Sequence, residues 1–517
     1  MTYFSLVTSI AVLLSVSSLT AASRLVLVPL DNRPATGQYA EMIGHIGGAE
    51  VVSPPMRFLG NFTIPGSPDA ILRWLDDQPL AVGDAYVVST DMICYGGLFE
   101  SRKSTVPTAI ALARLRKFLE IRKRSPLAKL YLVSTIMRLT PSATHDAASY
   151  RLALARYVEL RSQGDSPELK ELKAALPVGA LEEYDAARKR NHEVQKAMVA
   201  MAKREPIDLL VYGQDDAASH GPHETERATL KSLAAASPRI QFCEGIDQVP
   251  SLLVSRALLD GKPAPRLRVI PSDASRFDAV SAFESQPLTQ TVADQIRVSG
   301  ARQVGFNDAA DYTLYVNVPK RSQDKFTLWI DGMTSALDQN QPVAVADVNL
   351  TQGGSAPDPE LYFVLSDRGR PMKLLSYAAW NTAGNTIGTS VAAANMRLFT
   401  KGTTLATEVA HKHFLLYRMA NDFAYHTFTR PVAFGMTEGP RKDVIFGLEL
   451  HEVNDYVQRD LSKFLKKLFY DNFQGRRFTV QGKEYSFVGM TDLSIGLPWP
   501  RPYEVRLDFE IRASPVD

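Results

Sequence analysis

Short apolar segments that end abruptly in polar or charged residues recur along this chain and constrain its fold more than any other feature. The clearest lie at residues 25–34 (LVLVPLDNRP), 85–102, 129–138, 208–217, 342–354 and 373–385. Such runs are typical of strands buried on both faces of a parallel sheet. Functional residues collect at the carboxyl ends of such strands, because the loops converge there on a rigid scaffold. The pattern therefore predicts an α/β enzyme with one polar cleft.

Amphipathic stretches with helical periodicity separate the strand-like runs. About ten candidate strands alternate with them between residues 25 and 377, which predicts βα units and a mainly parallel sheet. This number suits either a barrel-like (β/α) core with two extra strands or two doubly wound lobes. We favour the barrel, because the polar strand ends are spread along the whole chain.

The two ends of the chain differ from its middle. The first 23 residues carry no charge, are apolar from Leu6 to Leu19 and end in small residues. They predict a signal peptide at 1–23 and a secreted protein, with a retained membrane anchor as the alternative. We expect an α/β catalytic domain at 24–430, with a charged helical insertion at 144–205, and a small α+β closing element at 431–517.

Charge and cysteine content narrow the function. The net charge of +2, from 58 Lys and Arg against 56 Asp and Glu, predicts no nucleic-acid partner and, after signal cleavage, no membrane association. The two cysteines, Cys94 and Cys243, exclude a scaffold built on disulfides. They leave open one disulfide or two buried thiols.

The sharpest candidate for chemistry is the pair Asp215 and Asp216, directly after the apolar run LLVYGQ. Adjacent carboxylates repel each other, so one tends to keep its proton while the other is ionised. General acid–base catalysis needs this division. The alternative is that both residues only cap the next helix. We predict that Asp215 and Asp216 are catalytic, together with Asp91 at an earlier strand end.

Other strand ends carry groups suited to binding a small polar ligand. Arg33 offers a planar fork to an anionic group, although an Asp31–Arg33 pair that fixes a turn is the alternative. Trp380 beside Asn381 combines an aromatic face with an amide, as hydroxylated ligands require, unless Trp380 belongs to the core and Asn385 caps a helix. The predicted substrate-binding residues are Asp31, Arg33, Tyr95, Arg102, Arg138, Asp347, Trp380, Asn381 and Asn385.

Signatures of cofactor and metal enzymes are absent from the sequence. It contains no GxSxG elbow, no Walker loop and no strand-linked GxGxxG, which argues against serine hydrolases of that type, P-loop enzymes and dinucleotide enzymes. Asp31, Asp91, Asp215 and Asp347 could supply oxygen ligands to a divalent ion, but no spacing marks them as a ligand set. We expect no cofactor and assign no metal ligand.

Several motifs together carry a resemblance. They are PLDNRP (29–34), STDMICYGGLFESR (89–102), STIMR (134–138), VYGQDDA (211–217), ADVNLTQGG (346–354), YAAWNTAGN (377–385) and LPWPRPYEV (497–505). Over residues 24–511 the chain resembles the uncharacterised, mostly bacterial family called domain of unknown function four-one-two-seven. Where that family has a Glu-Glu-Pro step and a later acidic pair, this chain has Asp146-Ala147-Ala148 and Asp247-Gln248. These positions are therefore not expected to be catalytic.

A looser similarity suggests a reaction. An Asp-Asp pair at the end of a central strand is similar to barrel glycosidases that use the acetamido group of their own substrate. This implies that Asp215 positions the acetamide, Asp216 is the acid/base and Asn381 contacts the sugar. The leading hypothesis is a secreted glycoside hydrolase whose partner is a carbohydrate or another small polar substrate. The alternatives are a metal-dependent hydrolase of phosphate or amide bonds, using Asp31, Asp91 and Asp215, and a non-catalytic carbohydrate-binding protein.

Overall fold

The computed structural model describes residues 23–142, 144, 147–351, 356–367, 369–437 and 447–516. The expected signal peptide therefore lies almost entirely outside the described residues, as do Asp146 and the Gly353-Gly354 pair. In the part of the chain that is described, no helix has the length and apolar character needed to cross a membrane.

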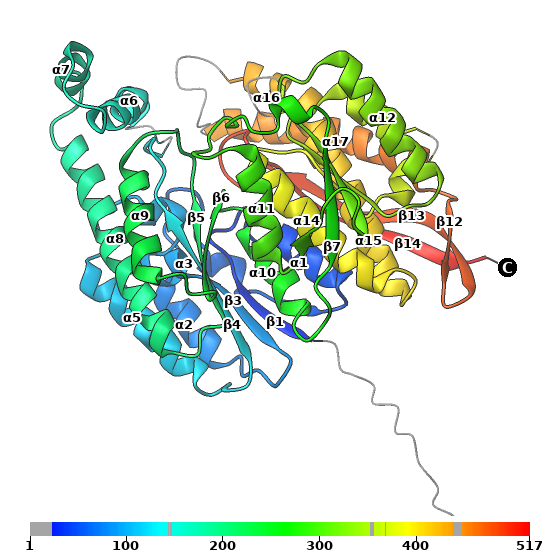
Figure 1. Ribbon diagram of the computed structural model, residues 1–517, viewed down its shortest axis with the longest axis horizontal. Helices are drawn as coiled ribbons and strands as arrows, with labels where there is room; N and C mark the ends of the chain where they lie inside the picture. Colours follow the sequence, from blue (N-terminus) through cyan, green and yellow to red (C-terminus); the bar gives the residue numbers. More distant parts are fainter. Residues whose placement is uncertain are drawn as a thin grey trace, which may run out of the picture.

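The first lobe is a sheet of parallel strands in the order β2-β1-β3-β4-β5-β6 (Figure 1). Side chains alternate between its two faces, so Leu25 and Leu27 of β1 belong to one apolar cluster while Val26 and Val28 belong to another. Helices α1 and α10 cover the first face, and α2, α3, α5, α8 and α9 cover the second. The strands are β1 (Arg24–Val28), β2 (Glu50–Val52), β3 (Ala85–Ser89), β4 (Lys129–Ile136), β5 (Leu209–Gln214) and β6 (Ile240–Glu244). The helices are α1 (Gln38–Ile46), η1 (Met56–Phe58), α2 (Pro68–Asp76), α3 (Thr90–Tyr95), α4 (Leu98–Ser101), α5 (Thr108–Arg122), α6 (Arg151–Arg161), α7 (Pro167–Ala174), α8 (Ala180–Arg204), α9 (Pro222–Ala234) and α10 (Val249–Leu258).

The second lobe is a separate sheet in the order β11-β10-β9-β7-β8. Numbered in chain order within each lobe, both sheets contain the flavodoxin-like order 2-1-3-4-5, and the first adds a sixth strand. The topology therefore repeats although the sequence shows no internal repeat. The strands are β7 (Arg266–Pro271), β8 (Arg302–Gln303), β9 (Tyr312–Asn317), β10 (Val343–Asp347) and β11 (Ser376–Ala378). The helices are η2 (Ala274–Arg276), α11 (Leu288–Ser299), α12 (Gln323–Asp338), α13 (Pro359–Leu365), η3 (Arg370–Lys373) and α14 (Ala383–Thr400).

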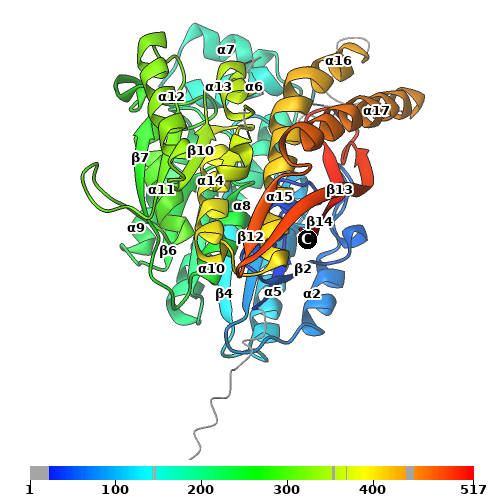
Figure 2. The ribbon, with the colours of Figure 1, turned by 90° about the vertical axis from the view of Figure 1, so that its right-hand side faces the viewer.

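The C-terminal part packs along both lobes and ends in an antiparallel sheet, β12-β13-β14, which lies beside α15 in Figure 2. Its elements are α15 (Leu405–Arg418), the π-helical segment η4 (Met419–Thr429), α16 (Arg430–Gly435), α17 (Gly447–Asn472), β12 (Arg477–Val480), β13 (Lys483–Gly496) and β14 (Arg506–Pro515). The boundary expected at residue 430 falls within a continuous helical run, since η4 passes directly into α16.

The predicted α/β class, the parallel strands and the small C-terminal α+β element are confirmed. The strands do not close into the favoured barrel but form two open sheets, which is the second of the two arrangements considered. The reason lies after β6, where α10 packs against α1 and α14 between the lobes and no described strand pairs with the free edge of β6.

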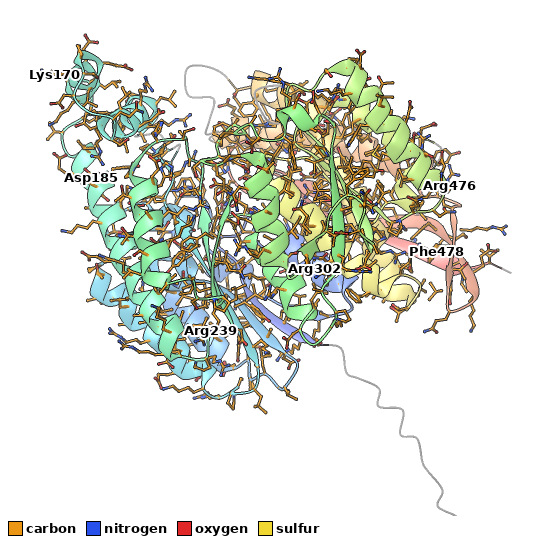
Figure 3. All side chains as sticks on the ribbon, in the orientation of Figure 1. Lys170, Asp185, Arg239, Arg302, Arg476 and Phe478 are labelled. Carbon is orange, nitrogen blue, oxygen red and sulfur yellow. The ribbon has the colours of Figure 1, made fainter. Side chains whose placement is uncertain are left out.

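The expected insertion at 144–205 has two parts with different packing. Helix α8 places Val194, Met198 and Ala202 in the core of the first lobe. Helices α6 and α7 share a separate apolar cluster with the first turns of α8 and project from the lobe, where Figure 3 shows charged side chains such as Lys170 of α7 and Asp185 of α8. Only this projecting part matches the charged helical insertion that was expected as a separate unit.

One apolar cluster crosses both lobes and the C-terminal part. It includes residues of β1, α1 and α10, residues of β10 and α14, and residues of α15, α17 and β14. Burial of apolar surface contributes about 25 cal/mol per Å², so a continuous core of this kind holds the two sheets as one body. The carboxyl end of the first sheet thereby acquires fixed neighbours from the rest of the chain.

A fully buried ion pair, Arg418–Asp422, joins three parts of this core. Asp422 Oδ2 accepts hydrogen bonds from Arg418 Nε at 3.0 Å and from the backbone N–H of Ala379, after β11, at 2.8 Å. The guanidinium also lies 4.3 Å from the ring centre of Tyr39 in α1 and 5.5 Å from that of Trp380. Loss of either charge would leave the other buried without a counterion.

We predict that Asp422→Asn lowers the free energy of unfolding by about 3–5 kcal/mol, because Arg418 keeps its buried charge. The control is Asp471→Asn, which breaks an exposed pair with Lys467 at the same four-residue spacing in a helix. It should cost less than about 1 kcal/mol. Urea denaturation of both variants measures the difference, and equal losses would contradict this account.

Candidate active site

A cavity of about 310 Å³ opens at the carboxyl end of the first sheet. Residues that follow β1, β4, β5 and β6 form one wall, Trp380 and Asn381 after β11 form a second, and the loop between β13 and β14 with η4 and α16 forms a third. Its charged residues are Arg33, Arg102, Arg138, Arg151, Arg430 and Arg501 with Asp215, Asp216, Asp247 and Glu504. The volume is that of a site for a small molecule.

Asp215 and Asp216 lie side by side in this cavity at the end of β5. Asp215 Oδ2 is 2.5 Å from Nη2 of Arg102, and its Oδ1 accepts the backbone N–H of Asp216 at 2.9 Å. Asp216 Oδ2 is 2.7 Å from Nη2 of Arg138. The next helix, α9, has Gly221 as its N-cap, so neither aspartate has the capping role considered as the alternative.

The surroundings shift the pKa values of these two carboxyl groups in opposite directions. Burial opposes ionisation of Asp215, but the charges of Arg102 and Arg138 outweigh it and hold its pKa below the ordinary value. The pKa of Asp216 is raised, because burial and the charge of Asp215 together outweigh the attraction of Arg138. The pair therefore has the division between an ionised and a protonated group that acid–base chemistry uses.

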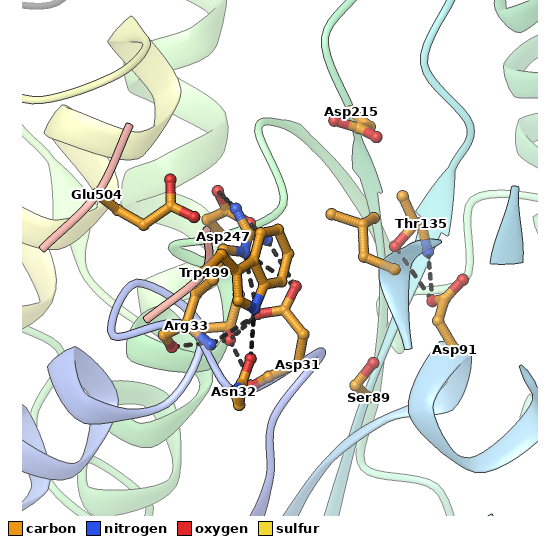
Figure 4. A network of polar contacts seen from close by, with 12 residues as sticks. Asp31, Asn32, Arg33, Ser89, Asp91, Thr135, Asp215, Asp247, Trp499 and Glu504 are labelled. Atoms are coloured by element: carbon orange, nitrogen blue, oxygen red, sulfur yellow. Dashed lines mark hydrogen bonds and ion pairs between the residues drawn. The ribbon is translucent and has the colours of Figure 1, made fainter. Parts of the chain in front are cut away.

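Arg33, which follows β1, lies between Asp31 from the same strand end and Asp247, which follows β6 (Figure 4). Its Nη2 is 2.8 Å from Asp31 and 2.8 Å from Asp247, and its guanidinium lies 4.8 Å from the ring centre of Trp499. Burial raises the pKa of Asp247 to about 6, with Asp31 and Asp215 adding to the shift and Arg33 opposing it. Asp31 thus fixes the turn while Arg33 also lines the cavity. Asp247, which the resemblance had set aside, lines it too.

The third wall comes from a segment in which the sequence patterns pointed to no site residue. Trp499 Nε1 donates a hydrogen bond to Asn32 Oδ1 at 2.6 Å, which ties this loop to the end of β1. Arg501 pairs with Glu504 at 2.9 Å and lies 4.5 Å from the Trp499 ring centre. The signal was present, since Trp499, Arg501 and Glu504 all belong to the shared motif LPWPRPYEV.

Two further binding candidates reach the cavity and one does not. Trp380 and Asn381 line it, but the Trp380 ring packs edge-on against Tyr39 at 5.3 Å and is largely buried, so it offers little free face for stacking. Asn381 has a φ of 58°, in the left-handed region that asparagine tolerates. Asn385 lies in the first turn of α14 and is buried outside the cavity lining.

The remaining candidates also lie outside the cavity lining. Asp91 accepts hydrogen bonds from the backbone N–H and the hydroxyl of Thr135 at 3.0 and 3.1 Å, and Figure 4 shows it turned away from the Arg33 cluster. Helix α3 begins at Thr90, so Asp91 lies in the first turn of this helix, and its side chain takes the direction set by the helix and not by the strand. Tyr95 lies beneath Arg190, and Asp347 is buried in the second lobe. The structure therefore brings together Asp215 and Asn381, with Asp31 behind Arg33, but not Asp91.

The structure describes no ready metal centre. Within its described ranges, no group of three or more His, Cys, Asp or Glu side chains is placed to hold an ion. Asp31, Asp91 and Asp215 bond instead to Arg33, Thr135 and Arg102. Cys94 and Cys243 are buried free thiols, which decides between the two alternatives left open for them.

Asp91 generates a prediction about pH. Burial raises its pKa from 3.8 to about 6, so between these values the folded state binds more protons than the unfolded chain. Stability contributed by this group is therefore present below pH 4 and lost as pH rises to 6, by about 3 kcal/mol. Asp91→Asn keeps an oxygen for Thr135 and should gain that amount relative to wild type over the same interval. Urea denaturation at both pH values measures it, and a pH-independent difference would contradict it.

Comparison with known proteins adds a family and no activity. The model of the family described as "Protein of unknown function (DUF4127)" matches residues 25–508. No curated protein and no solved structure matches. The similarity to barrel glycosidases thus gains no support. The family match covers nearly the whole described chain and confirms the resemblance carried by the seven motifs, so the chain belongs to the DUF4127 family.

Proposed function

We propose that the protein is a glycoside hydrolase that acts on a small carbohydrate in this cavity, with Asp216 as acid/base and Asp215 as a fixed negative charge. The observation that carries the proposal is that two adjacent carboxyl groups in one cavity have pKa values shifted in opposite directions. Two carboxyl groups with different protonation are what glycoside hydrolysis requires.

The contacts assign different roles to the two aspartates. The Asp216 side chain is 27% exposed, so it can reach a ligand and give its proton to the bridging oxygen as the glycosidic bond breaks. The oxygens of Asp215 are held by Arg102 and by the N–H of Asp216, so this carboxylate stabilises the positive charge that develops on the sugar. Water then supplies hydroxide to the sugar carbon and returns its proton to Asp216.

The rest of the cavity suits the recognition of a sugar. Beside the aspartates that follow β5, Tyr503 supplies a partly exposed aromatic ring, and Asn381 supplies an exposed amide that can both donate to and accept from hydroxyl groups. Because these side chains come from three parts of the chain joined by one core, they need little reorganisation when the ligand binds.

We predict that Asp216→Asn lowers turnover of aryl glycosides by about 10²–10⁴-fold while the protein stays folded. Asp215→Asn should also slow turnover, and more on acetamido sugars if the substrate assists. The control is Asp311→Asn, which removes a similarly exposed partner of an arginine, 2.9 Å from Arg266, outside the cavity. It should leave turnover unchanged.

A panel of aryl glycosides with melting temperatures for the three variants tests this proposal. Unchanged turnover in Asp215→Asn and Asp216→Asn would remove the pair from the site. Binding of glycans without any product would favour a carbohydrate-binding protein instead.

We also propose that the protein is secreted after cleavage near residue 23. Strand β1 begins at Arg24, which leaves no linker between the expected cleavage site and the sheet. We predict that N-terminal sequencing of protein from the culture medium gives a start near Arg24. A chain that starts at Met1 in the membrane fraction would contradict this prediction.

A further inference from the structure

Most arginines of the cavity wall have a carboxylate partner within the protein. Arg102 pairs with Asp215 at 2.5 Å, Arg138 with Asp216 at 2.7 Å, and Arg501 with Glu504 at 2.9 Å, and Arg33 is held between Asp31 and Asp247. Each of these guanidinium groups therefore has a carboxyl group as a direct partner before a ligand enters, and Arg138 is also attracted by Asp215 and Asp247.

Arg430 in the third wall differs from them. It is 9% exposed, and no ion pair joins it to a carboxylate among the described residues. Its Nε donates to the backbone oxygen of Pro502 at 3.0 Å, and its Nη1 lies 3.4 Å from Nδ1 of His426. The guanidinium carbon lies 5.0 Å from the ring centre of Phe434 and 5.2 Å from that of Tyr503.

None of these contacts supplies a full negative charge. His426 is neutral, because burial and the charges of Arg430 and Arg418 hold its pKa well below the ordinary value. Glu504 is near enough to attract Arg430 but is bound to Arg501. Aromatic faces attract a cation only weakly by comparison with a carboxylate. A nearly buried cation with these partners keeps most of the desolvation cost of its charge.

We infer that Arg430 binds an anionic group of the ligand, so that the substrate is an acidic carbohydrate carrying a carboxylate or a phosphate. A guanidinium offers a planar pair of N–H groups to either anion. The sugar part of this inference rests on the proposed function, whereas the anion part rests on Arg430 alone. Because it lines the third wall and forms no ion pair with a carboxylate among the described residues, we assign it as a specificity-determining residue.

Binding of matched acidic and neutral sugars tests the inference without any turnover. Isothermal titration calorimetry at low salt would compare glucuronate with glucose, galacturonate with galactose, and glucose 6-phosphate with glucose. We expect at least one acidic probe to bind about 10-fold or more tightly than its neutral parent, with a preference that weakens as salt rises. The uronates and the phosphate sugar separate the two sources of negative charge.

The variant Arg430→Gln should remove this preference while leaving affinity for the neutral parent within about twofold. The matched control is Arg122→Gln, since Arg122 is also buried and donates only to backbone oxygens, those of Pro126 and Ala128, far from the cavity. It should retain the preference. If Arg430→Gln unfolds, Arg430→Lys, which keeps the charge but loses the fork, should weaken acidic probes only.

The outcomes separate this inference from the proposed hydrolase. An Arg430-dependent preference for acidic probes supports the inference even if Asp216→Asn leaves turnover unchanged. Hydrolysis of neutral glycosides as fast as acidic ones, a preference that survives in Arg430→Gln, or no binding of any acidic probe at millimolar concentration would each overturn it.

Discussion

Packing of α1 and α10 against α14 and α15 is the constraint on which the rest of the structure depends. The first lobe alone would expose the outer sides of α1 and α10, and the shared apolar core removes these surfaces, and those of α14 and α15 that contact them, from water. Because this contact fixes one lobe against the other, the carboxyl end of the first sheet faces the end of β11 and the loop after β13. The cavity is a consequence of how the two lobes bury their faces.

Ion pairs inside the cavity oppose the increase in pKa that burial causes in a carboxyl group. A buried carboxyl group without an ion-pair partner has a raised pKa, as Asp91 has at about 6. Asp215 escapes this outcome because two arginines adjoin it. Buried ion pairs contribute little net stability, so their benefit here is a fixed arrangement of charges into which a ligand can bind without reorganisation. Arg430 in the third wall of the cavity has no ion-pair partner among the described residues, so its charge is not balanced in this way.

Local sequence patterns predicted the secondary-structure elements and part of the candidate site. The run LLVYGQ forms a buried strand and delivers Asp215 and Asp216 to the cavity, because a strand fixes the direction in which the chain continues. Asp91 could not be placed in the same way, since the helix that starts at Thr90 redirects its side chain. The choice between a barrel and two sheets depends on whether β6 finds a further partner, which no local pattern encodes. The contact between Asn32 and Trp499 joins residues at opposite ends of the chain, and only the fold reveals it.

The second lobe has the same strand order but uses its carboxyl edge differently. There Asp347 accepts hydrogen bonds from Asn317 at 2.9 Å and from the backbone N–H of Asp358 at 2.7 Å. Asp358 also accepts from Arg321 and Asn349 and caps α13. Burial and the nearby Asp358 raise the pKa of Asp347 to about 7, so this group is only partly ionised at neutral pH. These polar groups bond to one another, whereas those of the first lobe face a cavity. Equal topology thus gives the two edges different surroundings, since the charged groups named here at the second edge bond to one another while those of the first edge line a cavity.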